Sequence, residues 1–377
     1  MKVLIAAAGT GGHINPALAI ANEIKKRKPN VEIIFVGTTR GLEKDLVPRA
    51  GYPLKTIEVY GISREISLQN IKKMMKTIRG FGEAKRLIRE MKPDLVIGTG
   101  GYICGPIFLA ATKQKIPTIL HESNAFPGFT VRLLAKKVDC VLLGFAEAKK
   151  RLTKAKKLVV TGNPTKIHKQ NLSQEQIEAG KKQQGLDAKK PMVLVFGGSQ
   201  GARPINEALL SIIENKKNQD YTILWAAGPK QYDKIKEKMK QDKQDITKVE
   251  NAKIVPYIYQ MEDMLNLADL AVCRSGAMTI TEIAKVGKPA IFLPLPFAAE
   301  NHQEYNAKVL ENVGAAKILH DSELTGDLLH STIMQMIQDK EKLKLKQMGA
   351  KAKTVVKEGV EEKIYEEIEK VVKERLD

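Results

Sequence analysis

Three glycine-rich turns in this sequence each follow a short apolar run and precede a helical pattern. They are Gly9-Thr10-Gly11-Gly12-His13, Gly98-Thr99-Gly100-Gly101-Tyr102 and Gly197-Gly198-Ser199-Gln200-Gly201-Ala202. The backbone N–H groups of such a turn converge on an anion at a helix N-terminus, where the helix dipole adds attraction. The alternative is that the glycines only permit tight turns. Because the pattern occurs three times, each time after a predicted strand, it favours phosphate binding.

The first turn does not fit a nicotinamide or flavin dinucleotide. The dinucleotide fingerprint G-x-G-x-x-G would require a third glycine at position 14, where the chain has Ile14. It also requires an acidic residue at the end of the second strand, about twenty residues further on. That strand, Val31–Val36, closes on Gly37-Thr38-Thr39 instead. The sequence therefore disfavours a redox Rossmann site.

Two further stretches, residues 273–282 and 294–307, carry polar groups suited to a sugar nucleotide. In Cys273–Glu282, a carboxylate one turn into a helix beneath a glycine turn can accept both hydroxyls of a ribose. The alternative is that Thr279 and Glu282, which have capping-box spacing, only fix the helix start. The stretch 294–307 gathers groups suited to a polyhydroxylated substrate, although a solvated helix end has similar composition. These groups are Glu300, Asn301, His302, Gln303 and Asn306.

The elements that must position these residues alternate between strand-like and helix-like runs, which predicts parallel sheets with covering helices. The first series of predicted strands comprises Val3–Ala8, Val31–Gly37, Leu95–Gly98, Thr118–Leu120 and Cys140–Leu143. The second series comprises Met192–Phe196, Thr222–Ala226, Ala252–Pro256, Leu270–Cys273 and Ala290–Leu293. The two series begin with the same order of strand, glycine turn and amphipathic helix. We therefore expect an α/β protein with two Rossmann-like, doubly wound parallel-sheet domains facing a deep cleft.

The polar stretch 169–191 separates the two series and places the domain junction near Asn163-Pro164. The predicted domains are 1–163 and 164–349. The C-terminal stretch 350–377 includes a charged amphipathic helix, which we expect to pack back on the first domain.

Composition and charge restrict the class of protein. A chain of 377 residues is too long for one ordinary core, and no apolar run in it approaches the ~20 residues that span a bilayer. Three widely separated cysteines argue for a reducing cytosol and against a disulfide framework. The formal charge of +19 suggests an anionic partner: nucleic acid, an acidic membrane surface or a phosphorylated substrate. Few aromatic residues and no zinc-ligand pattern disfavour nucleic acid.

The segment 64–92 of the first domain is strongly basic. It holds nine Lys or Arg residues against three acids, with a helical stripe of Leu68, Ile71, Met75 and Ile78. Such a helix is ordinarily a solvated face over a core stripe. The alternative is a surface that binds an anionic membrane.

The whole chain resembles the MurG family of UDP-GlcNAc transferases. The matching motifs are GTGGHINPALA (9–19), GTGGYICGP (98–106), HESNAFPG (121–128), TGNP (161–164), GGSQGAR (197–203), CRSGAMTITE (273–282) and HQEYNA (302–307). The resemblance implies an inverting, metal-independent GT-B glycosyltransferase without a cofactor, at the cytoplasmic face of the cell membrane. It would add GlcNAc to the 4-hydroxyl of MurNAc in undecaprenyl-pyrophosphoryl-MurNAc-pentapeptide (lipid I), giving lipid II. Another GT-B enzyme, a glycolipid glycosyltransferase or a UDP-GlcNAc 2-epimerase, is the alternative.

The resemblance also implies the donor site, which the second domain would largely provide. The residues that carry over are Thr10, Gly11, Gly12, Asn124, Lys166, Ser199, Ile258, Ala277, Met278, Thr279, Ile280, Thr281, Glu282 and Gln303. In this assignment Ser199 meets the diphosphate and the Ile258 backbone binds uracil. Glu282 binds the ribose and Gln303 reads the GlcNAc hydroxyls. The chain has Lys166 where the family usually has arginine, and Val131 where it commonly has asparagine.

The acceptor pyrophosphate is assigned to the first domain, at the turn 9–13 and at Gly100, Gly101 and Tyr102. His13 would then lie near the acceptor hydroxyl, where a neutral imidazole could take its proton. The alternatives are that His13 caps a helix or orients a phosphate, and Glu122 is the rival base. No Asp-x-Asp pair occurs, so leaving-group charge would be stabilised by backbone N–H groups, Ser199 and a helix dipole.

Overall fold

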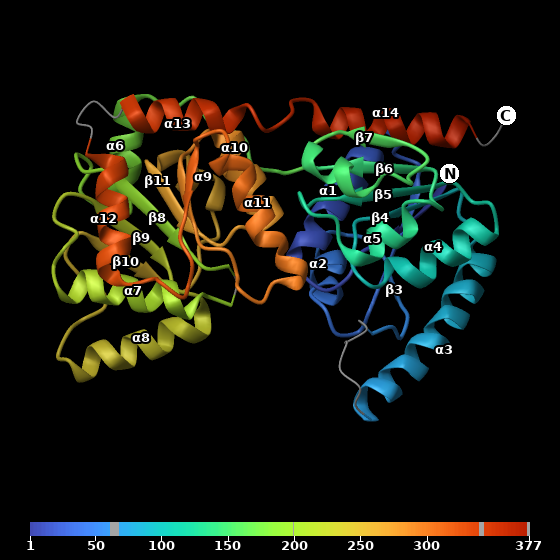
Figure 1. Ribbon diagram of the computed structural model, residues 1–377, viewed down its shortest axis with the longest axis horizontal. Coiled ribbons are helices and arrows are strands. Elements are labelled where there is room, and N and C mark those ends of the chain that lie inside the picture. The colour runs from blue at the N-terminus through green and yellow to red at the C-terminus, as the bar shows by residue number, and fades with distance from the viewer. Residues whose placement is uncertain (61–67, 199, 339–342, 375–377) are drawn as a thin grey trace. The chain divides into compact units, whose positions relative to one another are not determined.

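The computed structural model describes residues 1–60, 68–198, 200–338 and 343–374, apart from the side chains of 68–76 and 78 (Figure 1). The chain divides into two compact units. Unit 1 comprises Met1–Lys166 and Lys357–Asp377, and unit 2 comprises Ile167–Val356. The sequence-based boundaries, at 163/164 and 349/350, lie a few residues from these.

Unit 1 is built on a seven-stranded sheet in the order β3-β2-β1-β4-β5-β6-β7, and all its neighbouring strands are parallel. The strands are β1 (Lys2–Ala6), β2 (Glu32–Gly37), β3 (Leu54–Thr56), β4 (Leu95–Gly98), β5 (Thr118–Glu122), β6 (Cys140–Leu143) and β7 (Leu158–Val160). The helices are α1 (Gly11–Arg27), α2 (Glu43–Arg49), α3 (Leu68–Met91), α4 (Cys104–Lys113), α5 (Phe129–Leu134), η1 (Ala146–Arg151) and α14 (Val360–Lys373).

Both faces of this sheet are buried, which explains why its strands are continuous apolar runs rather than alternating ones. Val3 and Ile5 point to a core completed by α1, α2 and α14. Leu4 and Ala6 point to the other face, where α3, α4 and α5 complete a second core. The C-terminal helix α14 thus returns to the first series of strands and packs against α1.

Unit 2 repeats the arrangement with six parallel strands in the order β10-β9-β8-β11-β12-β13. The strands are β8 (Met192–Phe196), β9 (Thr222–Ala226), β10 (Ala252–Val255), β11 (Leu270–Cys273), β12 (Ala290–Phe292) and β13 (Ala316–Ile318). The helices are α6 (Gln174–Gln183), α7 (Arg203–Glu214), α8 (Pro229–Gln241), α9 (Met261–Leu267), α10 (Ala277–Val286), η2 (Ala299–Asn301), α11 (His302–Glu311), α12 (Gly326–Ile337) and α13 (Leu343–Lys353).

The predicted fold class, two Rossmann-like doubly wound parallel sheets, is confirmed. All ten predicted strands are present. The sequence did not predict three further strands, β3, β7 and β13, which lie at the edges of the sheets. The stretch 350–377 is not one helix, because Gly359 has a left-handed backbone (φ 62°) and separates α13 from α14. None of the helices in the described part of the chain combines the length and apolarity needed to cross a membrane.

The strand orders locate the ligand-binding edge of each unit. In such sheets ligands bind at the carboxyl ends of the strands, where the strand order reverses. In unit 1 the reversal lies between β1 and β4, and in unit 2 between β8 and β11. These strands precede the glycine turns 9–13, 98–102 and 197–202 and the loop that begins at Arg274. Each unit therefore presents two candidate anion-binding turns at its reversal point.

Candidate functional site

Four helices begin at the two reversal points: α1 and α4 in unit 1, and α7 and α10 in unit 2. Their N-cap residues, Thr10, Ile103, Ala202 and Gly276, make no side-chain capping bond, and none has an acidic residue in its first turn. The first N–H groups of a helix have no partner within it, so a helix that lacks a side-chain cap can offer them to an anion. The starts of α1, α4 and α7 follow the three turns for which the sequence predicts phosphate binding, and α10 begins in the stretch predicted to bind the nucleoside.

The side chain of His13, the last residue of the first glycine turn, lies next to the second glycine turn of unit 1. Its Nδ1 is 3.2 Å from the Ala8 carbonyl oxygen, and the Thr99 hydroxyl donates to the His13 carbonyl at 2.7 Å. A Cβ added to Gly100 or to Gly101 would lie 3.2 Å from the imidazole, so these glycines leave room for the ring. A carbonyl can only accept, and Nδ1 must therefore carry the hydrogen of a neutral ring, which leaves the lone pair on Nε2. This tautomer suits a base.

Glu122, the rival base, ends β5 and is buried. Its Oε1 accepts from the backbone N–H of Asn124 at 2.9 Å and from the Asn124 amide at 3.0 Å, and its Oε2 accepts from the Gly128 N–H at 2.8 Å. Burial raises the pKa of Glu122, while these hydrogen bonds act in the opposite direction. A carboxylate already engaged by three donors is suited to holding the loop 123–128. The geometry therefore favours His13 as the base.

His121 is a residue whose importance the sequence did not reveal, although it lies in a recognised motif. It is fully buried, with Nε2 3.2 Å from the Gly162 carbonyl oxygen and Nδ1 3.4 Å from the Ser123 hydroxyl. The Asn163 amide donates to the Ser123 carbonyl at 3.0 Å. These bonds join the motifs HESN and TGNP. The spacing of the two motifs in the chain gives no indication of this contact.

In unit 2 the turn 197–202 is tightly built. A Cβ on Gly197 would lie 2.4 Å from the Ala202 nitrogen, and one on Gly201 would lie 2.2 Å from the Ala227 carbonyl oxygen. Gly201 also has a left-handed backbone (φ 74°). Only glycine fits such a position without strain. Ser199, the predicted diphosphate contact, lies outside the described residues.

The loop after β11 is fixed by Arg274. Its guanidinium makes a bidentate ion pair with Asp321, at 2.6 and 2.8 Å, and donates to the Leu293 carbonyl at 3.0 Å. The ends of β11, β12 and β13 are thereby linked. Helix α10 begins at Ala277 with Gly276 as its N-cap, so Thr279 is the third helical residue and the capping-box interpretation of Glu282 is wrong.

The remaining donor candidates lie on neighbouring loops of unit 2. Ile258 is buried after β10, between Tyr257 and Tyr259, whose rings meet edge to face at 5.0 Å. Gln303, in the first turn of α11, uses Oε1 to accept from the Leu295 N–H at 3.0 Å. Of the helix residues, Ala277, Met278, Ile280 and Thr281 are buried, and Thr279 and Glu282 are partly exposed. Lys166 is exposed, at the end of the first segment of unit 1.

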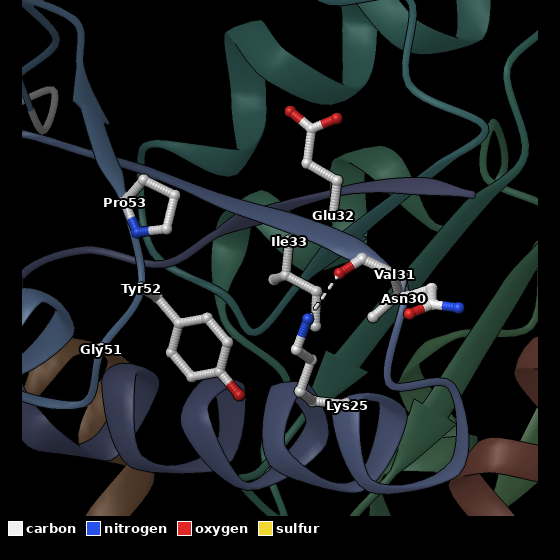
Figure 2. A pocket seen from close by; sticks show the side chains of 8 residues that line it. All are labelled: Lys25, Asn30, Val31, Glu32, Ile33, Gly51, Tyr52 and Pro53. Atoms are coloured by element: carbon white, nitrogen blue, oxygen red, sulfur yellow. Dashed lines mark hydrogen bonds between the residues drawn. The ribbon is translucent and has the colours of Figure 1, made fainter.

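A hollow of about 380 Å³ occurs elsewhere in unit 1 (Figure 2). Tyr52, Ile33 and Lys25 line it, and Lys25 donates to the Val31 carbonyl at 3.0 Å. It lies at the amino ends of β2 and β3, whereas the glycine turns lie at carboxyl ends. None of its lining residues is a site candidate. Among the described residues, no group of three or more His, Cys, Asp or Glu side chains is arranged to hold a metal ion.

Comparison with known protein families finds a matching domain in each half of the chain. Residues 3–143 match the glycosyltransferase family 28 N-terminal domain, and residues 192–364 match the C-terminal domain of the same family. The chain is therefore a glycosyltransferase.

Relatives of known name narrow the class further. The chain is 42% identical over 376 residues to a UDP-N-acetylglucosamine–N-acetylmuramyl-(pentapeptide) pyrophosphoryl-undecaprenol N-acetylglucosamine transferase of Acetivibrio thermocellus, covering 100% of this chain and 99% of the relative. It is 43% identical to a protein of the same name in Ruminiclostridium cellulolyticum, covering 99% of this chain and 100% of the relative. The crystal structure of Acinetobacter baumannii MurG superposes with a TM-score of 0.75 at 29% identity, covering 98% of this chain and 99% of that one. The chain belongs to the MurG family.

Proposed function

We propose that this protein transfers GlcNAc from UDP-GlcNAc to the 4-hydroxyl of MurNAc in lipid I, with inversion, and so produces lipid II for peptidoglycan synthesis. The observation that carries the proposal is the full-length relationship at 42% identity, in a chain whose two units each present candidate anion-binding turns at a reversal point. UDP-GlcNAc 2-epimerases share the fold at 15% identity, which supports no more than the fold.

The donor is assigned to unit 2. The N–H groups of the turn 197–202 and of the start of α7 would stabilise the negative charge that develops on UDP as it leaves. Ser199, and from unit 1 Thr10, Gly11, Gly12, Asn124 and Lys166, remain proposed donor contacts. Ile258 would bind uracil through its backbone, and residues 277–282 would enclose the nucleoside, with Glu282 on the ribose hydroxyls.

Gln303 has a defined orientation for reading the sugar. Because its Oε1 already accepts from Leu295, its amide nitrogen is the atom left to donate to a GlcNAc hydroxyl. The resemblance alone implies the residue, and the hydrogen bond to Leu295 suggests which atom acts.

The acceptor is assigned to unit 1, with its pyrophosphate on the turn 10–12 and on Gly100, Gly101 and Tyr102. His13 Nε2 takes the proton from the 4-hydroxyl as the oxygen attacks the anomeric carbon. The new C–O bond forms on the face opposite the bond that breaks, and that electron pair leaves on the β-phosphate of UDP. This scheme uses no cofactor and no metal ion.

Since lipid I carries a prenyl chain, we place the enzyme peripherally at the cytoplasmic face of the cell membrane. In the proposed contact segment 64–92, residues 64–67 and the side chains of 68–76 and 78 lie outside the described structure. Arg79 and Phe81 of α3 are described and exposed. A second surface supports the same assignment, and we call it the α5–η1 face. It consists of Phe129 and Leu133, which are 57% and 53% exposed, and the exposed residues Lys136, Lys137, Lys149 and Lys150.

The Phe126 ring connects the two halves of the α5–η1 face. The Arg132 guanidinium of α5 lies 5.0 Å from the ring centroid, and that of Arg151 in η1 lies 4.4 Å from it. Exposed apolar side chains surrounded by cations favour an anionic bilayer surface, because lysines near the surface contribute about 1 kcal/mol each.

The proposed reaction is tested by incubating the protein with UDP-GlcNAc and a short-chain lipid I analogue, followed by mass analysis. We expect one GlcNAc to be added per UDP released. A UDP-GlcNAc 2-epimer formed without any acceptor would favour the epimerase alternative. Addition to a diglyceride but not to the lipid I analogue would favour a glycolipid glycosyltransferase.

A further inference from the structure

Glu43 is a fully buried carboxylate that no proposed step of the reaction uses. It is the first residue of α2, and its side chain reaches back to the glycine turn after β1. Oε2 accepts from the Gly9 N–H at 2.9 Å. Oε1 accepts from the backbone N–H and the hydroxyl of Thr38, at 2.9 and 2.7 Å. Burial of a carboxylate costs free energy unless hydrogen bonds compensate for the lost water. Here three donors at the ends of β1 and β2 provide those bonds, so the Glu43 side chain is held in one place.

Two glycines make room for this carboxylate. A Cβ on Gly37 would lie 2.5 Å from the Glu43 Cγ, and one on Gly41 would lie 2.0 Å from its Oε2. The neighbouring Leu42 N–H donates to the Gly9 carbonyl at 3.2 Å. The segment 38–43 therefore holds residue Gly9 through both its backbone N–H and its backbone carbonyl group.

The turn held in this way carries His13. Gly9 has a left-handed backbone (φ 98°), and Ala8, directly before it, provides the carbonyl that accepts from His13 Nδ1. A shift of Gly9 would move that carbonyl, and with it the orientation of the imidazole. Misplacement of a catalytic group by about 1 Å can cost on the order of a hundredfold in rate.

Glu43 also occupies the positions that a nucleotide would need in unit 1. In nucleotide-binding Rossmann domains the first turn offers its N–H groups to phosphate, and an acidic side chain at the end of the second strand binds the ribose. Here the Gly9 N–H donates a hydrogen bond to the Glu43 carboxylate of α2, which lies against Thr38, directly after β2.

We propose that Glu43 is a positioning residue that fixes the β1–α1 turn so that His13 is oriented toward the acceptor. The positioning of the imidazole stands on the contacts of unit 1 alone. Its effect on turnover rests on the proposed transferase function.

The test compares two variants with one control. Glu43→Gln replaces one of the two accepting carboxylate oxygens by an amide nitrogen, which donates and cannot accept. Gly41→Ala keeps the charge and displaces the carboxylate, and the backbone of Gly41 does not require glycine. The control is Glu367→Gln, which alters another buried carboxylate of unit 1. Glu367 lies on α14 and is ion-paired with Lys370 of the same helix and with Lys157, directly before β7. Thermal unfolding of each variant shows whether it folds.

We expect Glu43→Gln and Gly41→Ala each to lower kcat by roughly tenfold to a hundredfold. UDP affinity, measured by calorimetry, should stay at the wild-type value, because the residues proposed to bind the nucleoside of the donor lie in unit 2. The NMR resonances of the His13 ring should change in both variants and remain unchanged in Glu367→Gln.

Unchanged His13 resonances in a folded Glu43→Gln or Gly41→Ala protein would overturn the positioning role. Equal losses in all three variants, in proportion to lowered stability, would overturn it as well, because that result indicates general destabilisation. Failure of the proposed function is a separate result: the wild-type protein would transfer no GlcNAc, while the His13 readout would still report on Glu43.

Discussion

One amide group determines how Gln303 can recognise a sugar. In Gln303→Glu the carboxylate keeps the bond from the Leu295 N–H but offers no donor to a GlcNAc hydroxyl. We expect UDP affinity to be unchanged and UDP-GlcNAc affinity to fall by about 0.5–1.5 kcal/mol, the usual contribution of one hydrogen bond. Calorimetry with both ligands measures the difference. Gln303→Ala is the comparison, since it also releases Leu295, and equal binding of UDP-GlcNAc by wild type and Gln303→Glu would remove Gln303 from the sugar site.

His13 carries the chemical step in the proposed mechanism. His13→Ala should lower kcat by roughly 10²–10⁴ with donor affinity nearly constant, because a general base acts only in the transition state. Steady-state kinetics with calorimetry of UDP binding gives both quantities. If acceptor KM rises and kcat is largely kept, His13 orients a phosphate instead. A comparable loss of kcat in Glu122→Gln, with a mild His13→Ala, would assign the base role to Glu122.

His121 should make stability depend on pH in the mildly acidic range. Burial lowers the pKa of His121 from its ordinary 6.5 to about 4, while its bond to Gly162 acts in the opposite direction. The unfolded chain therefore binds a proton before the folded one does, and stability is complete above pH 6.5 and is lost as the pH falls toward 4. The difference corresponds to about 3 kcal/mol. About 2 kcal/mol of this difference falls between pH 7 and pH 5. Urea unfolding at these two pH values should show that loss in the wild type and much less of it in His121→Gln. The same loss in both proteins would contradict the assignment.

At the scale of elements, the Arg274–Asp321 pair holds three strand ends together next to the predicted nucleoside loop. Both side chains are largely buried, 12% and 15% exposed, so removal of one leaves a charge without its partner. Asp321→Asn should therefore lower both the melting temperature and UDP affinity. The exposed pair Arg203–Glu207, also in unit 2 and 77% and 58% exposed, gives the matched control in Glu207→Gln, which should change neither. A stable Asp321→Asn protein with wild-type UDP affinity would show that the pair does not shape the donor loop.

The α5–η1 face makes a second prediction at this scale. Phe129→Ser with Leu133→Ser should weaken binding to vesicles that contain phosphatidylglycerol or cardiolipin, and high salt should release the wild-type protein. Leu343→Ser, which alters an exposed apolar residue of unit 2, should have no effect. Sedimentation with vesicles and turnover of a water-soluble acceptor are the measurements. Equal turnover losses on soluble and membrane-embedded acceptors would indicate that this face shapes the acceptor site and does not bind membrane.

Which elements the sequence predicted depends on their burial. The central strands of both sheets are buried runs made mostly of apolar residues, and all of them were predictable. The strands β3 and β13 are three-residue edge strands in which lysine is central, as in Leu54-Lys55-Thr56, and such short runs carry little periodicity. The glycine turns were predictable because they follow strands directly.

The contacts made by Glu43, His121 and Arg274 were not predictable from spacing. Each of them reaches a partner that the fold alone brings close: Gly9 lies 34 residues from Glu43, Gly162 lies 41 residues from His121, and Asp321 lies 47 residues from Arg274. The sequence at the end of β2, Gly37-Thr38-Thr39, contains no acid, yet Glu43 from the next helix occupies that place. Local sequence pattern identifies the turns, whereas tertiary packing determines what supports them.

At the scale of the whole molecule, the central claim is a direct, inverting transfer of GlcNAc to lipid I. The most direct measurement is the NMR spectrum of the disaccharide product, formed from UDP-GlcNAc and a soluble lipid I analogue in excess EDTA. We expect a β-linked GlcNAc on the MurNAc 4-hydroxyl, with one UDP released per disaccharide. An α-linked product, or UDP release without a disaccharide, would contradict it, as would activity that EDTA abolishes and magnesium restores.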